Sequence, residues 1–211
     1  MSDWYRKKTW TKEDEEHFFS KLARARKDGR AQYLKIQAIV LVETKEPELL
    51  NIAKELLQKI LDEYPNDNFN KSSVYNTFGE IFSLEKNIEK SLQYYKKSID
   101  FEEVYPNVQT GSYLGYSELI IKNQLTHEYL NVEKILEDKI SGLLFPIEKY
   151  KVFSILAILN YHNSKKEIAK EFAKLANENA QTETSGLRYH KHLGIVSERD
   201  VFLEQILNKK L

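Results

Sequence analysis

Small residues recur along this chain at an almost constant distance, and that recurrence limits the fold more than any other feature. Ser91 follows Ala53 by 38 residues, and Ala169 follows Ser91 by 78 residues, which is two steps of 39. Each stands where apolar residues return every three or four positions, as in an amphipathic helix. Two such helices, in a unit of ~30–40 residues, cannot bury their apolar faces alone and therefore stack. The recurrence predicts stacked helix pairs, whereas a helical bundle would show apolar stripes without a fixed period.

The composition also favours an all-α fold. Only seven Gly and four Pro interrupt 211 residues rich in Leu, Ile, Lys and Glu, which suits helices better than a turn-rich sheet protein. Thr11, followed by acidic residues, is expected to cap the first helix, and Ser72 or Ser73 the fourth. Apolar periodicity predicts about ten helices and no strand. The expected helices cover 12–27, 33–43, 49–61, 74–84, 88–101, 113–121, 126–140, 150–161, 168–180 and 199–209.

One unit of the recurrence carries a recognisable motif. Its first helix reads Tyr75-x2-Phe78-Gly79-x2-Phe82 and its second Ser91-x3-Tyr95-x2-Ser98. This pattern resembles the tetratricopeptide repeat, in which aromatic, large apolar and small residues mark the first helix and small residues let the second approach closely. The resemblance implies that Gly79 and Ser91 lie where the paired helices cross, with Tyr95 between adjacent repeats.

A second copy of the motif is visible in Phe153-x2-Leu156-Ala157, followed by Ala169-x3-Ala173-x2-Ala176. An intermediate unit at Leu114-Gly115 is degenerate, because its second helix carries Leu130 or Asn131 where a small residue is expected. The resemblance implies a right-handed α-solenoid of about four tetratricopeptide-like pairs. It implies a single helical domain over 1–211, divided into an N-terminal capping helix and segment (1–30), helix-pair repeats (31–180) and a C-terminal cap with its own helix (181–211).

The chain carries no motif that indicates catalysis or a cofactor. None of its seven glycines forms a phosphate-binding loop, and no cysteine is present to act as nucleophile or zinc ligand. The five histidines do not form a metal-binding pair on one helix face. Gly115-Tyr116-Ser117-Glu118-Leu119 lacks the final glycine of a hydrolase elbow. We therefore expect no enzymatic activity, no metal and no cofactor.

Charge and hydropathy limit the cellular setting. Lys plus Arg and Asp plus Glu both total 32, so no overall field draws the chain to nucleic acid or to an anionic membrane. The longest apolar runs, 36–42 and 153–159, are far shorter than the ~20 residues that cross a bilayer. The polar start lacks the apolar stretch of a secretory signal. These features predict a cytoplasmic protein.

The N-terminal segment allows two interpretations. Trp4, Tyr5 and Trp10 alternate with Arg6 to Lys8, so the aromatic rings could cap the apolar end of a helical array or stack on bases. We favour the cap. The segment also resembles the opening of a group of uncharacterised bacterial tetratricopeptide-like proteins, which implies a bacterial source. A local positive excess follows this segment and favours an acidic partner. The excess is formed by Arg24, Arg26, Lys27 and Arg30.

The resemblance implies a non-enzymatic scaffold that binds a protein or peptide on a concave face lined by the first helix of each pair. Family geometry suggests these contact residues: Gln32, Lys35, Asn76, Glu80, Ser112, Tyr116, Ser154, Tyr161 and His162. Chaperone-cofactor members hold a C-terminal carboxylate with Lys and Asn, but Glu80 would repel that ligand. The alternatives are an immunity or antitoxin-type protein that neutralises a toxin, and a nucleic-acid-binding protein that uses the basic-aromatic N-terminus.

Overall fold

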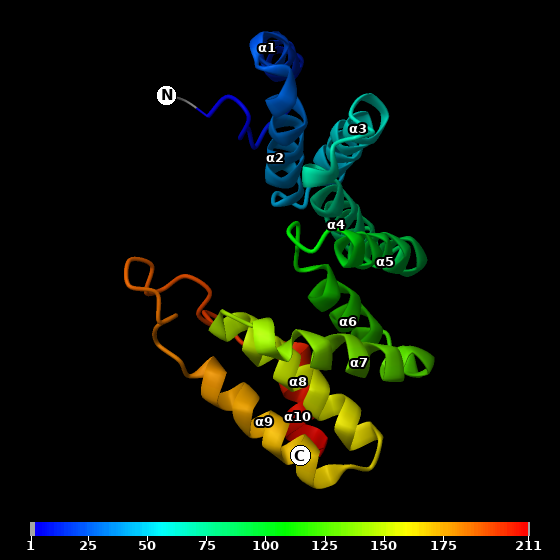
Figure 1. The fold of residues 1–211 in the computed structure, drawn as a ribbon, viewed down its shortest axis with the longest axis vertical. Helices are drawn as coiled ribbons and strands as arrows, with labels where there is room; N and C mark the ends of the chain where they lie inside the picture. The colour runs from blue at the N-terminus through cyan, green and yellow to red at the C-terminus, as the bar shows by residue number, and fades with distance from the viewer. Residues whose placement is uncertain (1–2, 211) are drawn as a thin grey trace. The chain divides into compact units, whose positions relative to one another are not determined.

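A computed structural model describes residues 3–210 of the chain (Figure 1). Over these residues it contains ten α-helices and no strand, as the apolar periodicity predicts. The helices are α1 (Lys12–Arg24), α2 (Arg30–Val42), α3 (Pro47–Glu63), α4 (Asn68–Leu84), α5 (Ile88–Val104), α6 (Ser112–Lys122), α7 (Tyr129–Lys139), α8 (Pro146–His162), α9 (Lys166–Ala180) and α10 (Val201–Lys210). Short 3₁₀ turns lie at Lys27–Gly29, Thr126–Glu128 and Ile140–Gly142. The all-α prediction is confirmed.

The chain forms two compact units, Met1–Tyr116 and Ser117–Leu211. The break falls inside α6, so α1 to α5 belong to the first unit and α7 to α10 to the second. The sequence predicted a single domain over 1–211, with segments 1–30, 31–180 and 181–211. The division into two compact units does not test that prediction, which stays open. Each unit has buried apolar residues of its own.

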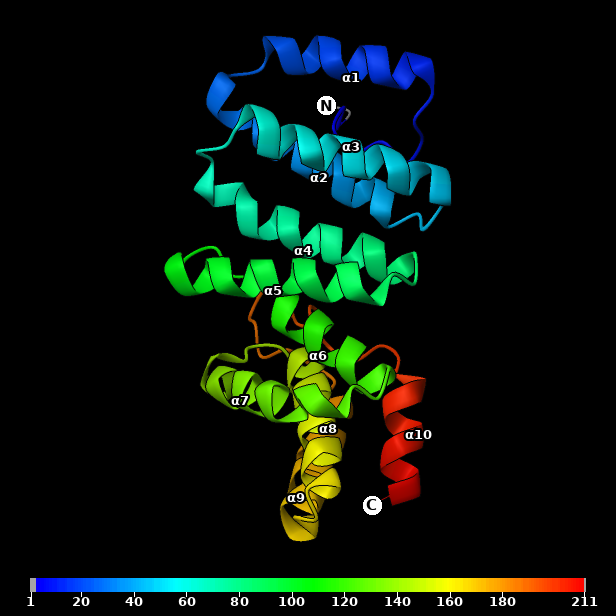
Figure 2. The same ribbon diagram turned by 90° about the vertical axis from the view of Figure 1, so that its right-hand side faces the viewer.

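In the first unit, consecutive helices pack as close pairs. α2 packs against α3 and α4 against α5, while α2 and α3 also contact α4 (Figures 1 and 2). Leu34 and Leu41 of α2, Leu57 of α3 and Ile81 of α4 are fully buried in one apolar cluster. Burying a side chain of this size contributes ~1.5–3 kcal/mol, so the pairs are held mainly by these apolar faces.

The crossing of α4 and α5 depends on small residues. The Ser91 hydroxyl donates to the Gly79 carbonyl oxygen at 2.7 Å. A Cβ atom on Gly79 would lie only 2.6 Å from Cδ1 of the buried Tyr95 ring, and one on Gly115 of α6 would lie 2.6 Å from its Cζ. Tyr95 therefore fits against α4 and α6 because both positions lack a side chain. The predicted crossing of Gly79 and Ser91 is confirmed.

The second unit is arranged around α8. Every residue from 152 to 160 is buried, and α8 contacts α7, α9 and α10. The small residues Ala169 and Ala176 of α9 are buried, and the Phe153 and Phe172 rings of α8 and α9 stack with centroids 6.0 Å apart. A helix that is apolar on all sides needs neighbours on all sides, which explains this central position.

Two helix starts show how side-chain capping sets the boundaries. The Thr11 hydroxyl accepts the Asp14 N–H, and the Asp14 carboxylate accepts the Thr11 N–H, so the predicted cap of α1 is confirmed. The predicted cap at Ser72 or Ser73 is wrong. Asp67 caps α4 instead, by accepting the N–H groups of Phe69 and Asn70. An aspartate ahead of Ser72 allows the helix to begin more than a turn earlier.

Candidate functional site

The first unit contains a groove of about 500 Å³ between α2 and α4. Its apolar lining comes from both helices and from Tyr95 of α5, while charged residues stand around it. The lining residues are Ile39, Val42, Glu43, Lys45, Glu80, Ser83, Leu84 and Tyr95. Apolar walls with a few polar groups are typical of a surface that binds part of another molecule.

Glu80 places a carboxylate on the wall of this groove. Its side chain is half-buried, and burial raises the pKa of its carboxyl, although the hydrogen bond from Asn76 opposes the rise. Asn76 Nδ2 donates to Glu80 Oε1 at 2.8 Å. Within residues 3–208, no Lys, Arg or His side chain forms a salt bridge with Glu80. The groove wall therefore presents a carboxylate that has no salt-bridge partner among the described side chains.

A buried polar network lies behind Asn76. The Ser112 hydroxyl donates to Asn76 Oδ1 at 2.9 Å, and the Ser112 N–H donates to the Thr110 hydroxyl oxygen at 3.2 Å. This network fixes Asn76 with its amide oxygen toward Ser112 and its amide nitrogen toward Glu80. The Glu80 carboxylate is thus oriented by residues outside the groove.

The network ends at Glu102 of α5, whose side chain is almost fully buried. Glu102 Oε1 accepts hydrogen bonds from the Ser72 hydroxyl at 2.7 Å, the Thr110 N–H at 2.9 Å and the Thr110 hydroxyl at 2.6 Å. Because a buried carboxylate is costly without partners, these bonds hold the 110–112 turn against α4 and α5. This is why Ser72, expected as a helix cap, is buried within α4.

The structure brings three of the predicted contact residues together in the first unit: Asn76, Glu80 and Ser112. Of these, Ser112 is fully buried and so does not reach an accessible face, a correction to its predicted role. Tyr116 is buried as well and needs the same correction. Both lie on α6, whose inward face holds the small hydroxyl of Ser112 in the network and packs Tyr116 in the core.

The other predicted residues of the first unit lie on α2. Gln32 is exposed, and Lys35 is half-buried with its ammonium 5.6 Å from the centroid of the Phe69 ring. Burial lowers the pKa of Lys35, while the nearby Asp67 opposes that change. The Lys35 ammonium therefore lies against Phe69 of α4 and does not extend freely into solvent.

Three predicted contact residues lie on α8 in the second unit. Ser154 is fully buried, so its predicted role needs correction: α8 is enclosed on all sides at this position. Its hydroxyl has no hydrogen-bond partner among residues 3–210. Tyr161 is half-buried, and the exposed His162 meets the Tyr129 ring edge-on at 5.0 Å. The contact roles of Tyr161 and His162 stay predictions.

The N-terminal aromatic rings pack onto the first unit. The Trp4 centroid lies 4.9 Å from Tyr33 and 5.3 Å from Phe18, and the Tyr5 centroid lies 4.8 Å from Tyr33. Trp10 lies 5.3 Å from Phe18. The rings lie against the aromatic side chains of α1 and α2, as the cap interpretation expects.

A buried amide anchors the same segment, and the sequence interpretation missed it. Gln37 of α2 is fully buried; its Oε1 accepts the Lys7 N–H at 2.9 Å and its Nε2 donates to the Lys7 carbonyl at 2.6 Å. The sequence did contain a signal for this contact. Gln37 stands within the apolar stripe of α2, and a buried amide requires hydrogen-bond partners.

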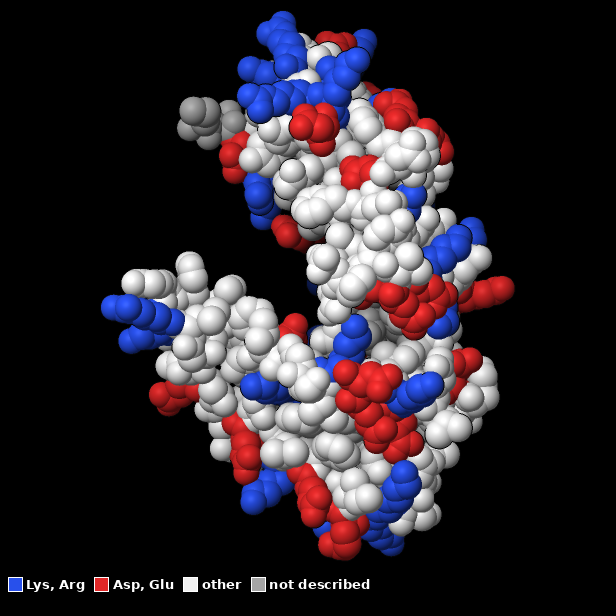
Figure 3. All heavy atoms as spheres, in the orientation of Figure 1, with Lys and Arg blue, Asp and Glu red and all other residues white. Residues whose placement is uncertain are grey.

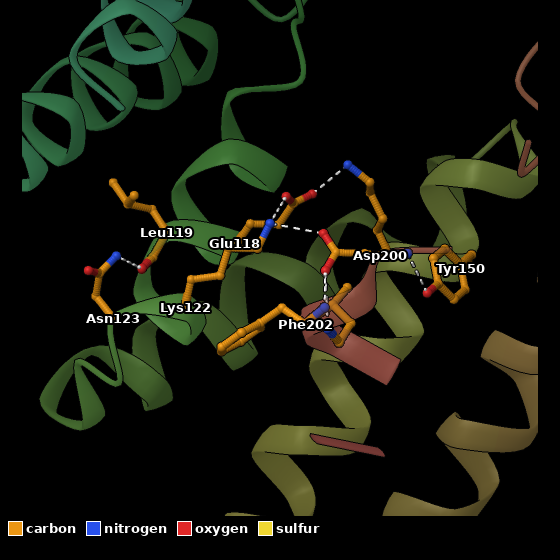
Figure 4. Close-up of polar contacts among 9 residues, drawn as sticks. Glu118, Leu119, Lys122, Asn123, Tyr150, Asp200 and Phe202 are labelled. Atoms are coloured by element: carbon orange, nitrogen blue, oxygen red, sulfur yellow. Dashed lines mark hydrogen bonds and ion pairs between the residues drawn. The ribbon is translucent and has the colours of Figure 1, made fainter. Parts of the chain in front are cut away.

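The second unit holds its C-terminal helix through connected polar contacts (Figure 4). Asp200 Oδ2 lies 2.9 Å from Lys122 Nζ on α6, and its Oδ1 accepts the N–H groups of Phe202 and Leu203 at 3.0 and 3.1 Å. Lys122 also pairs with Glu118 at 3.3 Å. Asp200 therefore caps α10 and connects it to α6.

The pKa values around Asp200 follow from these contacts. Burial would raise the pKa of Asp200, but the hydrogen bonds from Lys122 and from the Leu203 N–H outweigh it and lower the pKa. The pKa of Tyr150 is raised, first by burial and then by Glu204, which accepts the phenol hydrogen bond at 3.0 Å. Asp200 N–H donates to the same phenol oxygen at 3.1 Å. These groups satisfy one another and hold α10 in place.

Two kinds of feature are absent from the part of the chain that the structure describes. Across residues 3–210, no three His, Asp or Glu side chains gather closely enough to bind a metal ion. None of the helices described there has the length and apolar character that spanning a bilayer requires. No protein-family model matches the chain, and neither does any curated protein or solved structure.

Proposed function

We propose that this chain is a non-enzymatic, tetratricopeptide-like scaffold of the bacterial cytoplasm that holds a segment of another protein in the groove between α2 and α4. The proposal includes a right-handed solenoid of about four helix pairs. It is supported by the small-residue crossing at Gly79 and Ser91, and by Ala169 and Ala176, which are buried on α9 two steps further along the recurrence.

The observation that carries the proposal is the carboxylate of Glu80 on an apolar groove wall. Glu43 adds a second acidic group, while Lys45 is the one cation among the residues that line the groove. A half-buried carboxylate without a cationic partner is stabilised when a ligand supplies one. The fitting occupant is a peptide segment that places an apolar side chain against Ile39, Val42 and Leu84 and a Lys or Arg beside Glu80.

A peptide array probed with purified protein tests this proposal. We expect bound peptides to combine an apolar residue with a nearby Lys or Arg, and Glu80→Gln to abolish the preference for the cation. Glu103→Gln is the matched control, because Glu103 is an exposed carboxylate on α5. Enrichment of acidic peptides, or an unchanged profile in Glu80→Gln, would show that the groove does not select this class of segment.

The raised pKa of Glu80 gives the same proposal a pH dependence. Because burial raises the pKa, the carboxylate becomes protonated at a higher pH than an ordinary glutamate. Affinity for a cationic peptide should therefore be full above that pKa and fall as the pH decreases through it. Glu80→Gln should remove this dependence in a fluorescence-anisotropy titration.

The nucleic-acid alternative is less well supported by the contacts at the N-terminus. Single-strand binding without sequence preference uses aromatic rings on which bases stack. Trp4 and Tyr5 contact each other, and Trp4, Tyr5 and Trp10 each pack against Phe18 or Tyr33. The immunity or antitoxin alternative shares the scaffold and differs only in the partner, so no separate contact favours it.

A further inference from the structure

The junction between α1 and α2 carries a concentrated positive charge that the groove does not use. Lys21, Arg24, Arg26 and Lys27 lie within seven residues, and within residues 3–208 none of them forms a salt bridge. Figure 3 shows Lys and Arg gathered at the end of the first unit that carries α1. Surface cations that form no salt bridge attract an anionic partner, and the nearby Asp28 offsets only part of their charge.

Local structure explains why these arginines remain available. α1 ends at Arg24 because Ala25 takes an extended conformation, and the 3₁₀ turn Lys27–Gly29 then leads into α2. Arg30, which the sequence groups with them, is already engaged: its Nη2 donates to the Ala23 carbonyl at 2.6 Å and its Nε to the Ala25 carbonyl at 3.1 Å. It satisfies the carbonyls at the end of α1.

A hollow of about 530 Å³ lies at this junction. Arg24 and Arg26 line it together with Gln32, whose amide can donate hydrogen bonds, and with Asp28 and the half-buried Tyr33. Two guanidinium groups and an amide on one concave surface can bind carboxylates through paired N–H donors. Asp28 disfavours ligands that would crowd a negative charge against it.

We propose that this hollow, formed by Arg24, Arg26 and Gln32, is a second docking site and that it binds an acidic segment of a partner protein. An acidic protein segment fits better than nucleic acid because the aromatic ring at the hollow, Tyr33, is packed against Trp4 and Tyr5 at 4.9 and 4.8 Å. A stacking surface for bases is therefore already covered. The site stands independently of the groove at Glu80.

The test uses the full chain and a fluorescein-labelled peptide of about eight residues that alternates Glu and Ser, at ~50 mM salt. We expect saturable binding that weakens as salt increases, and no binding of the matching Gln-Ser peptide. Arg24→Gln/Arg26→Gln should reduce affinity by about tenfold or more. Arg24→Lys/Arg26→Lys should lose part of it, because lysine keeps the charge but not the paired donors.

The matched control is Lys134→Gln/Lys174→Gln, which makes the same change in net charge at exposed positions of the second unit. It should bind the acidic peptide as the unchanged protein does. Absence of binding at ~50 mM salt, an equal loss in this control, or tighter binding of a single-stranded oligonucleotide of equal charge would overturn the proposal. Glu80→Gln should leave acidic-peptide binding unchanged, so failure at one site is distinguishable from failure at the other.

Circular dichroism separates a binding defect from misfolding. Arg24 and Arg26 are exposed, so both double variants should keep the thermal midpoint of the unchanged protein. If the Arg24→Gln/Arg26→Gln protein melts early, the Arg24→Lys/Arg26→Lys protein and the salt dependence of binding decide whether the site exists. Partial affinity in this lysine variant, together with binding that weakens as salt increases, supports the site. Full affinity in the lysine pair, without salt dependence, contradicts it.

Discussion

The two units bury their apolar residues in different ways. In the first, the buried side chains are distributed over α1 to α4, and the core passes from one helix pair to the next. In the second, the continuous buried stretch 152–160 belongs to one helix, and α7, α9 and α10 contact it. Stability in the first unit is therefore spread over successive contacts, whereas in the second it depends strongly on α8.

The units also differ in how a chain end is fixed. The first uses aromatic rings and a backbone pairing with Gln37, which remove apolar surface from water. The second buries Leu203 of α10 and adds the Asp200 and Lys122 contact together with a helix cap. Apolar burial generally contributes more than a partly exposed ion pair. We thus expect the first unit to lose more stability when its terminal segment is altered.

The largest effect should come from deletion of residues 1–10, which leaves the α1 cap Thr11 in place. Loss of Trp4, Tyr5 and Trp10 exposes apolar surface on α1 and α2, and full burial of such side chains contributes ~1.5–3 kcal/mol each. Since the rings are partly buried, we expect a loss of about 3–5 kcal/mol in the free energy of unfolding. Chemical denaturation measures it.

The matched control for this deletion is Arg6→Gln/Lys8→Gln, which alters exposed charges and keeps the rings. It should change stability by less than ~0.5 kcal/mol. A truncated protein that melts almost normally but no longer binds single-stranded nucleic acid would contradict the cap interpretation and favour base stacking.

Gly79→Leu should rank second. A Cβ atom at this position would meet the Tyr95 ring at 2.6 Å, so α4 and α5 must separate, at a cost of ~1–3 kcal/mol or more. Gly142→Leu is the control, because a Cβ atom added to Gly142 would have no neighbour within 4 Å. Equal thermal midpoints for the two variants would mean that the crossing is not tightly packed.

Gln37→Leu should destabilise the intact chain by about 1–3 kcal/mol, because the Lys7 N–H and carbonyl lose their partners. In the protein lacking residues 1–10, the same substitution should be neutral or stabilising, since the amide would otherwise be left unpaired. A double-mutant cycle from urea unfolding measures this coupling. Additive effects would show that Gln37 does not anchor the segment.

Asp200→Asn should have the smallest effect, about 1 kcal/mol or less, because asparagine still caps α10 while the attraction to Lys122 is lost. Asp200→Ala should cost about 1 kcal/mol more, since the cap is lost too. The lowered pKa of Asp200 means that its charge stabilises the fold above the ordinary aspartate pKa and that this contribution disappears as pH falls through the lowered value.

Melting curves at neutral and acidic pH check the sign of this last effect. The unchanged protein should exceed Asp200→Asn in thermal midpoint at neutral pH, and the difference should vanish in acid. A difference that grows as the pH falls would contradict the assignment of the stabilising form to the ionised carboxylate.

Local patterns predicted the helices and one crossing well. Apolar spacing located the helices, and the Gly79, Ser91 and Tyr95 motif placed their crossing correctly, since close approach requires small residues. Helix starts were less predictable, because Asp67 and the serines at 72 and 73 are all acceptable caps by sequence. Only the contact with Glu102 shows why Ser72 lies inside α4.

The candidate site was predicted less well because exposure depends on tertiary packing. The family pattern placed Ser112, Tyr116 and Ser154 on an accessible face, yet all three are buried. Asn76 and Glu80 do lie together, but the groove beside them also requires Tyr95 from α5. The spacing of residues along the sequence predicts neither this arrangement of three helices nor the boundary between the two units inside α6.

The position of Tyr95 has a consequence for how the chain can change over generations. One ring occupies the space left by two glycines 36 positions apart, Gly79 and Gly115, on different helices. A side chain at either glycine is tolerable only if residue 95 becomes smaller at the same time. In related chains these three positions should therefore vary as a set, with bulk at 79 or 115 accompanied by a small residue at 95.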